Sequence, residues 1–563
     1  MGPIIASVEL AQTAMKDMKW NEALQSEHRE PALKALDDEL KSLEKRILTP
    51  ILPGNPKFSR AVKEATPGRL LLDIKRSGKY KVRGVKQGFR ENKEIADGYD
   101  FSYYSNVVKL HAVRLTLMRR RKPGGTIGYK DVSTAFLQTN SYPDGMTKFV
   151  CFKHPVTKQW MCYEQSGPIY GEASAPVRWE DTIAPWIEEQ GFIRGSNEPS
   201  VFYHPDRDLV ILLYVDDIMV DGQDDDCKWI FGLLSERFDC TDAVWLLEGE
   251  IVDYLGIEVT LIQGVTYMCM STYIEKCCEH LQIDGKSSPV PITAPIETDS
   301  PLLDGAGIKQ FLTANGMLGW LAQTVRLDVS YAYSRIAQHC AKPTEAALKA
   351  VRKVFAYLKA TKDLSIASCN VDSSRTIDEV IVQANPEYQN VFRFFSDSDH
   401  AGNSEEQNKR RSQNGALSTV DGAPWWWLSK ASSVCFACPE IGEAHADMSS
   451  GAVEIYAAGN ACMDIMGLRY MIQEMGMDFP SPFILEMDND AAKIFCQGNA
   501  QKTKLKHIDT RQHWVRCLRD KNLMKPAHVP TEDNLADIFT KILPTHIFLR
   551  LRDQLLKPRP CPK

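Results

Sequence analysis

Two adjacent carboxylates, Asp216 and Asp217, stand between two apolar runs at residues 209–213 and 218–220. The apolar, β-branched composition of both runs predicts a hairpin of two buried strands with the acids at its tip. Burying two negative charges beside apolar strands is costly unless a cation balances them. Mg²⁺ would do so, because it takes oxygen ligands and bridges to phosphates. The alternative is a polar hairpin turn without chemistry.

A third carboxylate, Asp131, ends a short strand predicted for residues 127–132. A helix, a hairpin and a second helix follow before the hairpin that carries Asp216 and Asp217. This order is that of a split βαβ unit with a ferredoxin-like layout, so we expect the three acids at neighbouring strand ends. Three such acids can bridge two Mg²⁺ ions about 3.5–4 Å apart, an arrangement that suits in-line phosphoryl transfer.

A second set of acids occurs in the C-terminal third of the chain, where a new domain is predicted to begin near Val391. Each acid falls at a predicted strand end or on a helix that would pack against the same sheet. Four carboxylates need two metal ions to coexist, and such a pair suits cleavage of a phosphodiester by activated water. Any one of them alone is readily explained as a surface residue, but the combination favours a site. The four are Asp397, Glu454, Asp488 and Asp537.

The composition is that of an ordinary globular protein. The 563 residues suffice for about three or four domains, and 44% of them are hydrophobic and 25% charged. No apolar run approaches the ~20 residues of a membrane span, and the N-terminus lacks a signal peptide. Fifteen cysteines without framework spacing predict reduced thiols, with Cys435 and Cys438 structural rather than zinc ligands. We therefore expect an intracellular protein, cytoplasmic or nuclear, that is not secreted and has no membrane partner.

The net charge of −6 argues against a uniformly basic nucleic-acid binder, but the charge is unevenly distributed. Residues 57–122 contain 18 Lys and Arg against 6 Asp and Glu, and residues 501–525 contain 8 against 2. Each stretch is either solvated surface or a local groove for an anion. On the strand predicted for residues 80–86, basic and apolar residues alternate. Lys81 and Arg83 on its wet face are therefore expected to bind a triphosphate.

Several short motifs resemble, in order, those of the reverse transcriptase and ribonuclease H of Ty1/copia-type retrotransposon polyproteins. Tyr214-Val215-Asp216-Asp217 resembles the polymerase box of the family, and residues 130–137 resemble its DVKTAFL motif. The resemblance extends from about residue 23 to residue 541. The other similar segments are residues 80–83 with 88–89 (YKARLVARGF), 254–258 (FLGIE), 326–329 with 357–361 (TRPDI…YLKGT), 395–402 (YSDADWAG), 504–509 (RTKHID) and 535–541 (LADIFTK).

The resemblance implies a role for each candidate residue. Asp131, Asp216 and Asp217 would hold the polymerase metal ions, and Asp397, Glu454, Asp488 and Asp537 would be the ribonuclease H acids. Each site would take two Mg²⁺ ions, with Mn²⁺ as the alternative. Phe136 would be the steric gate against a ribose 2′-OH, or else an ordinary core residue, and Tyr214 would line the substrate site. The implied partners are an RNA template, a DNA primer, their RNA–DNA hybrid and dNTPs.

The implied fold is multidomain, α+β and α/β: a right-hand polymerase with a ferredoxin-like palm, a helical thumb or connection, and a ribonuclease H-like domain. The expected boundaries follow composition and element order. They are an N-terminal helical segment at 1–56, fingers and palm at 57–265, thumb or connection at 266–371, a linker at 372–389, the ribonuclease H-like domain at 390–545 and a C-terminal tail at 546–563.

Two motifs depart from the family pattern. In residues 170–179, Ala173 and Ser174 replace the polar Lys-Gln pair of YGLKQSPRAW, and residues 449–455 keep Glu454 but lose its neighbours in SSTEAEY. Two alternatives therefore stay open: a decayed or co-opted element that binds nucleic acid without polymerase activity, and a polymerase-dead protein with a live nuclease.

Overall fold

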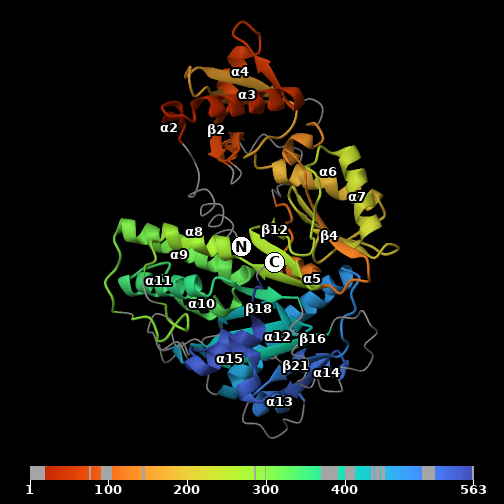
Figure 1. Ribbon diagram of the computed structural model, residues 1–563, viewed down its shortest axis with the longest axis vertical. Helices are drawn as coiled ribbons and strands as arrows, with labels where there is room; N and C mark the ends of the chain where they lie inside the picture. Colours follow the sequence, from red (N-terminus) through yellow and green to blue (C-terminus); the bar gives the residue numbers. More distant parts are fainter. Residues whose placement is uncertain are drawn as a thin grey trace.

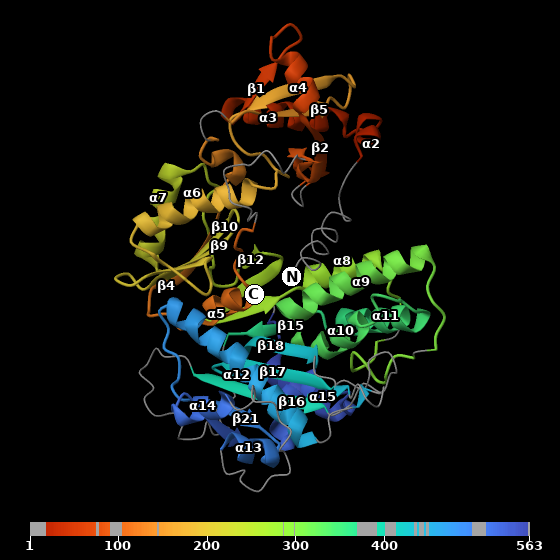
Figure 2. The ribbon, with the colours of Figure 1, turned by 180° about the vertical axis from the view of Figure 1, so that it is seen from behind.

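The computed structural model has an upper lobe built from the N-terminal part of the chain and a larger lower body (Figures 1 and 2). Among the residues that it describes, no helix has the length and hydrophobicity needed to cross a membrane. The predicted linker 372–389, Cys435 with Cys438, and most of the basic stretch 501–525 lie outside the described residues. The residues that the structure describes are 19–74, 78–90, 104–142, 146–284, 287–297, 299–368, 391–399, 412–432, 436–437, 444–445, 450–497 and 514–560.

The upper lobe is a five-stranded sheet of order β1-β6-β5-β2-β3 with α3 packed on β3. Leu36 and Leu43 of α3 are buried against this sheet, as their helical spacing predicts. The helix predicted to reach Leu48 ends at Arg46, and Leu48 instead begins a strand that pairs with β6. The elements of the lobe are α2 (Trp20–Leu24), α3 (Arg29–Arg46), β1 (Leu48–Ile51), α4 (Phe58–Glu64), β2 (Thr66–Ile74), β3 (Tyr80–Lys86), β5 (Lys148–Lys153) and β6 (Trp160–Gln165).

The hairpin β5–β6 was expected within the unit that carries the paired acids, but it belongs to the sheet of the upper lobe. β5 pairs in parallel with β2, a long-range contact that local patterning does not encode. The prediction of uniformly reduced cysteines is wrong at one pair. Cys151 and Cys162 lie directly opposite each other on the two strands and form a disulfide, with Cα atoms 4.2 Å apart.

A six-stranded sheet of order β11-β4-β10-β9-β8-β7 lies below this lobe. β10 runs between β4 and β9 and is antiparallel to both, while α6 and α7 form the two crossovers. Ile183, Val220 and Phe231 are buried in the core between these helices and the sheet. The elements are α5 (Leu110–Met118), β4 (Gly125–Asp131), the 3-10 helix η2 (Ala135–Gln138), α6 (Ala175–Glu189), β7 (Ile193–Arg194), β8 (Val201–His204), β9 (Leu209–Tyr214), β10 (Asp217–Gln223), α7 (Asp224–Arg237) and β11 (Val244–Trp245).

The next region combines a sheet of order β12-β13-β14-β15-β23 with four main helices. The four helices predicted between residues 272 and 361 are confirmed, because their apolar faces pack together in the largest core cluster. The segment expected as a C-terminal tail contains most of α15 and also β23, which pairs with β15. The elements are β12 (Ile251–Tyr254), β13 (Ile257–Ile262), β14 (Val265–Cys269), α8 (Ser271–His280), α9 (Gly305–Thr324), η3 (Leu327–Val329), α10 (Ser330–Ala337), α11 (Glu345–Ala360), β15 (Leu364–Ala367), α15 (Thr545–Leu555) and β23 (Lys557–Pro558).

The C-terminal sheet has the order β18-β17-β16-β21-β22. β18, β17 and β16 are antiparallel, whereas β16, β21 and β22 are parallel, and α12 packs against β16. Asp537, expected on a last α-helix, lies in the short 3-10 helix η7. The elements are β16 (Phe392–Asp399), β17 (Gln413–Val420), β18 (Ala423–Ala431), α12 (Ser450–Glu474), β21 (Phe483–Met487), α13 (Asp490–Cys496), α14 (Trp514–Asp520), β22 (Met524–His528) and η7 (Leu535–Phe539).

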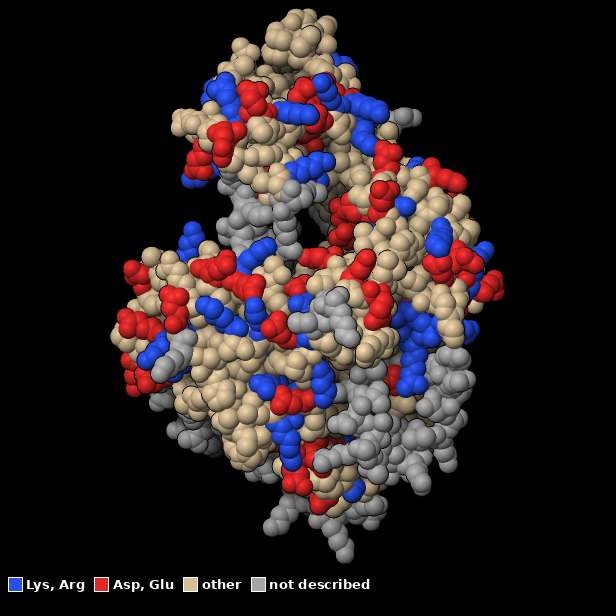
Figure 3. Space-filling model, in the orientation of Figure 1, with Lys and Arg blue, Asp and Glu red and all other residues tan. Residues whose placement is uncertain are grey.

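The C-terminal sheet docks directly on the polypeptide that precedes it. Arg114 of α5 is buried and donates to the carbonyl oxygens of Trp425 (2.7 Å) and Thr324 (2.8 Å). Arg120 forms a two-pronged ion pair with Asp421. Charge-assisted bonds of this kind are stronger than neutral ones, so these contacts fix the C-terminal sheet against α5 and α9. On the face shown in Figure 3, described Lys and Arg side chains are interspersed with Asp and Glu.

Candidate active sites

Asp131, Asp216 and Asp217 come together at one end of the six-stranded sheet. Asp217 is the first residue of β10, and its Cα partner on β4 is Asp131. The backbone N–H of Val132 donates to the carbonyl oxygen of Asp216 over 2.9 Å, which ties the turn to the neighbouring strand. Tyr214, the last residue of β9, is the partner of Asp217 on the other side. The expected juxtaposition of these acids is therefore present in the structure.

The turn that carries Asp216 is unusual because Val215 has a φ of 56°. A β-branched residue rarely adopts this left-handed conformation, which costs about 1–3 kcal/mol. The surrounding structure compensates, since the buried Trp179 of α6 donates its indole N–H to the Val215 carbonyl oxygen over 2.7 Å. Trp179 also meets the ring of Phe238 edge to face at 5.3 Å. The strained turn is thus held by a rigid aromatic contact, as is common at functional sites.

The three acids perturb one another electrostatically. Burial and the neighbouring Asp131 raise the pKa of Asp216, and Lys81 and Arg83 partly oppose the shift. Burial, with Asp216 and Asp131, raises the pKa of Asp217 to about 7. Carboxyl groups in such a position retain protons at neutral pH unless a cation balances them. A divalent metal fits this oxygen-rich set better than a protein cation would.

Sequence reasoning missed Tyr170, which lies beside the same acids. Its ring centroid is 5.4 Å from that of Phe136, and burial, followed by Asp216, raises the pKa of its hydroxyl group. The residue begins the segment in which Ala173 and Ser174 replace the Lys-Gln pair of the family motif. The signal that could have found it is the retained Tyr-Gly at the start of that motif.

The segment after Tyr170 is fixed by a buried carboxylate, Glu172. Lys148 and Lys86 contact its oxygens at 2.9 and 3.3 Å, and Tyr142 donates to it at 2.7 Å. Ser174 is also buried and donates to Glu172 over 3.1 Å. Burial opposes the charge of Glu172, but Lys86 and Lys148 outweigh it and lower its pKa to about 2. The hydroxyl group of Ser174 therefore belongs to this network and is not available to substitute for the missing glutamine.

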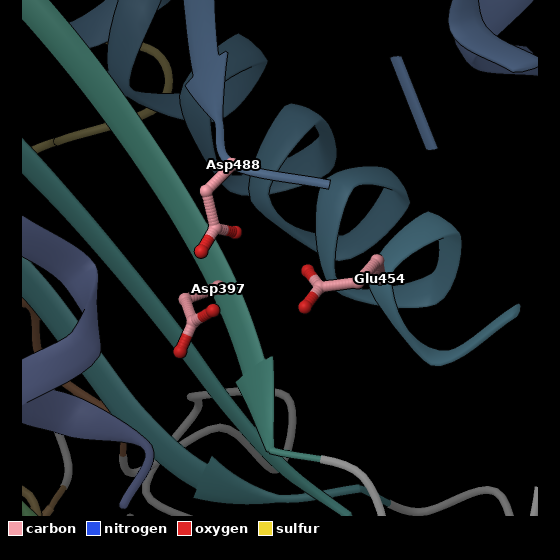
Figure 4. Close-up of side chains that lie close together, drawn as sticks. All are labelled: Asp397, Glu454 and Asp488. Atoms are coloured by element: carbon pink, nitrogen blue, oxygen red, sulfur yellow. The ribbon is translucent and has the colours of Figure 1, made fainter. Parts of the chain in front are cut away.

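A second acid cluster lies in the C-terminal sheet. Asp397, Glu454 and Asp488 each place one carboxylate oxygen so that the three oxygens lie within 4.8 Å of one another. The three side chains face a common space (Figure 4). Asp397 is on β16 and Asp488 directly follows β21. Because these strands are parallel, with Phe395 opposite Glu486, the two aspartates lie side by side. Glu454 reaches the same point from α12, so the expected convergence of these three is present.

The fourth predicted acid, Asp537, is not part of this triad but is bridged to Asp397 by a lysine. Lys541 Nζ is 3.0 Å from Asp537 Oδ1 and 3.6 Å from Asp397 Oδ2. Thr540 donates its hydroxyl proton to the same oxygen of Asp397. Sequence reasoning quoted Lys541 within a motif but gave it no role. Its proximity to the acids depends on how η7 packs against β17, which the sequence does not encode locally.

Charge in this second cluster is only partly balanced. Burial, with Asp397 and Asp488, raises the pKa of Glu454 well above its usual range. Burial and Asp397 raise the pKa of Asp537 to about 8, although Lys541 lowers it. Within the described part of the chain, Asp397 Oδ1 and Glu454 Oε2 are buried without a hydrogen-bond partner. Buried carboxylate oxygens of this kind are costly, and a divalent metal ion would satisfy them.

Comparison with known proteins identifies the class of the central part of the chain. Residues 54–297 match the family described as reverse transcriptase (RNA-dependent DNA polymerase). Asp131, Asp216 and Asp217 lie within this match, so the first acid cluster falls in the part of the chain that is similar to reverse transcriptases. The structure of telomerase from Candida albicans in complex with a fragment of telomeric RNA is also similar, with a TM-score of 0.27 and 10% identity over 59% of this chain and 65% of that one. A similarity this low carries no argument.

The relatives identify the kind of protein more closely. The chain is 24% identical to the retrovirus-related Pol polyprotein from transposon TNT 1-94 of Nicotiana tabacum, over 94% of this chain and 38% of the relative. It is 25% identical to that of transposon RE2 of Arabidopsis thaliana (83% and 30%), and 22% identical to the Ty1-NL2 Gag-Pol polyprotein of Saccharomyces cerevisiae (87% and 27%). The resemblance to Ty1/copia-type Pol polyproteins is thereby confirmed. The chain spans about a third of the length of these relatives.

Proposed function

We propose that the protein is an RNA-directed DNA polymerase with an attached ribonuclease H. The observation that carries the proposal is the pairing of Asp131 with Asp217 in the region that matches reverse transcriptases. The separate cluster of Asp397, Glu454 and Asp488 supports the second activity. Two divalent ions at each site would activate the attacking oxygen and stabilise the charge that develops on the phosphate.

In the polymerase site, Asp131, Asp216 and Asp217 would hold divalent ions, which would activate a primer 3′-OH for attack on a dNTP. Lys81 and Arg83 are half-buried on β3 and attract Asp216 electrostatically, so their positive charge extends to the acids. They bind the triphosphate of the incoming nucleotide. Phe136 excludes a ribose 2′-OH by contact, and Tyr214 lines the site from β9.

In the nuclease site, the carboxylates of Asp397, Glu454, Asp488 and Asp537 would hold divalent ions, which would supply an activated water and charge stabilisation for cleavage of the RNA strand. Asp397, Glu454 and Asp537 are buried and Asp488 is half-buried, which limits access of bulk water and strengthens electrostatic interactions there. Asp397 belongs to both sets of contacts: it is part of the triad with Glu454 and Asp488, and Lys541 links it to Asp537. An RNA–DNA hybrid binds mainly through its backbone, so contacts are independent of base sequence.

Each region takes a part in this proposal. The upper lobe serves as the fingers, and the six-stranded sheet serves as the palm. The order β11-β4-β10-β9 with crossovers α6 and α7 supports a ferredoxin-like palm. Helices α8 to α11 form the thumb or connection, and the mixed C-terminal sheet is the ribonuclease H-like domain.

Primer extension on poly(rA)/oligo(dT) tests the polymerase, and cleavage of the RNA strand in a hybrid tests the nuclease. Asp216→Asn should abolish extension and leave cleavage intact, whereas Asp488→Asn should do the reverse. Extension that is unchanged in Asp216→Asn, or cleavage that is unchanged in Asp488→Asn, would refute the corresponding assignment.

A second candidate function is nucleic-acid binding without polymerase activity. It is favoured by Ser174, which is buried against Glu172 instead of facing a nucleotide. In that case wild-type protein would bind hybrid in a salt-dependent manner and extend no primer. Hybrid cleavage without extension would identify a polymerase-dead protein with a live nuclease.

A further inference from the structure

The nuclease cluster is asymmetric about Asp397. One of its oxygens, Oδ1, is buried without a hydrogen-bond partner among the described residues, as is Oε2 of Glu454. Oδ1 of Asp537 also accepts no hydrogen bond there, but it has an ion-pair contact of 3.0 Å with Lys541 Nζ. The other oxygen of Asp397, Oδ2, accepts from the Thr540 hydroxyl group and lies 3.6 Å from Lys541 Nζ. Asp397 thus belongs to a triad with Glu454 and Asp488, and also to a second position where Lys541 lies between it and Asp537. Lys541 also attracts Glu454 and Asp488 electrostatically, but the contacts within 4 Å are to Asp397 and Asp537.

The segment that carries Lys541 is anchored to the sheet. Asn534 is fully buried and donates its side-chain amide to the Ser396 carbonyl oxygen over 3.2 Å, and Ser429 donates to the Phe539 carbonyl oxygen over 2.6 Å. Gly415, the Cα partner of Asp397 on β17, leaves room for this approach. A Cβ there would lie 3.0 Å from a backbone oxygen of η7 and 2.7 Å from Thr540 Cγ2. The ammonium group is therefore held between Asp397 and Asp537 by the fold.

We infer that Lys541 occupies the second-ion position of this site, between Asp397 and Asp537. The inference rests on the proposed ribonuclease H function. An ammonium group and a divalent ion cannot share this space, because like charges repel strongly at such short separations. The protein without nucleic acid therefore takes one divalent ion, at the Asp397–Glu454–Asp488 triad. The second ion enters when Lys541 leaves, which a nucleic-acid phosphate promotes by binding the ammonium group.

Mn²⁺ binding followed by electron paramagnetic resonance tests this without measuring activity. The parent protein is the full chain carrying Asp216→Asn and Asp217→Asn, so that no ions bind at the polymerase site. The reference protein carries Asp397→Asn in addition, so that no ions bind at the nuclease site either. Relative to this reference, the parent should bind one Mn²⁺ per chain. Adding Lys541→Met should raise the number to two, with the spin-coupled signal of ions about 3.5–4 Å apart. Lys541→Arg, which keeps the charge, should stay at one.

The outcomes separate this inference from the proposed function. A spin-coupled pair in the parent, or a single ion in the Lys541→Met variant, would overturn the role of Lys541 while leaving the metal site intact. No difference between the parent and the Asp397→Asn reference would overturn the nuclease site and the inference together. Lys541→Gln serves as a second neutral variant, and thermal melting of each protein confirms that it is folded.

Discussion

The two acid clusters differ in how the fold assembles them and in what balances their charge. Asp131 and Asp217 are direct partners on adjacent antiparallel strands, with Asp216 in the turn between β9 and β10. The acids of the C-terminal cluster come from β16, α12, the end of β21 and η7, and a lysine lies among them. The first cluster thus follows from strand register, whereas the second requires four separate elements to pack correctly. A cluster assembled from remote elements can incorporate a cation that no local pattern predicts.

The largest expected effect is the loss of primer extension when an acid of the first cluster is replaced, while hybrid cleavage is retained. Asp217→Asn should lower primer extension by about 10³-fold or more, because it removes a ligand of the transition-state metal ions. Hybrid cleavage by the same variant should stay within about twofold of wild type. Steady-state rates of both reactions on one preparation provide the comparison, and a parallel loss of cleavage would show that the clusters are not independent.

Glu172 differs from the acids of both clusters, because the lysines Lys86 and Lys148 balance its buried charge. Glu172→Gln should destabilise the upper lobe by about 3–5 kcal/mol, because Lys86 and Lys148 lose their buried counter-charge. The double variant Lys86→Ala/Glu172→Leu, which restores the residues of the family motifs at both positions, should recover much of the loss. Urea unfolding monitored by fluorescence measures both. Equal destabilisation in the single and double variants would contradict the pairing.

The same carboxylate predicts the pH dependence of stability. The pKa of Glu172 is lowered to about 2 in the folded protein from 4.5. Its contribution, on the order of 3 kcal/mol, is therefore present above pH 4.5 and is lost as the pH falls from 4.5 towards 2. Urea midpoints of wild type should decline over this window, and those of Lys86→Ala/Glu172→Leu should decline less. An identical decline in the two proteins would count against this account.

A smaller effect is expected from the contact that holds the polymerase turn. Trp179→Phe removes the bond to the Val215 carbonyl oxygen and leaves a buried acceptor unsatisfied, which costs about 1–3 kcal/mol. Primer extension should fall by roughly tenfold, because misplacement of the acids weakens catalysis. Cleavage should be unchanged. Extension equal to that of wild type would mean that the strained turn needs no support from α6.

The smallest expected effect is the release of protons from the acid clusters when metal ions bind. The raised pKa values of Asp217, about 7, and Asp537, about 8, mean that these groups hold protons near neutral pH in the absence of metal. Metal ions bind the ionised form, so Mn²⁺ binding should release protons, and its affinity should rise as the pH increases from about 6 to 8. Calorimetry in two buffers of different ionisation enthalpy measures the release. Affinity that is independent of pH would contradict these shifts.

The sequence by itself determined the elements that depend on neighbours in the chain. The hairpin with Asp216 and Asp217 and the strand ending in Asp131 were predictable, because alternation and β-branching reflect local strand formation. The order of these elements also predicted that the acids meet. The helices between residues 272 and 361 followed from their apolar spacing in the same way.

Only the tertiary structure decided what surrounds those acids. It brought Tyr170 next to Phe136, buried Glu172 between Lys86 and Lys148, and joined β5–β6 to the upper lobe. These contacts link residues far apart in the chain, and their energies depend on burial and on charge partners that no short segment contains. For the same reason the position of Lys541 could not be predicted, since it depends on η7 packing against a glycine of a different strand.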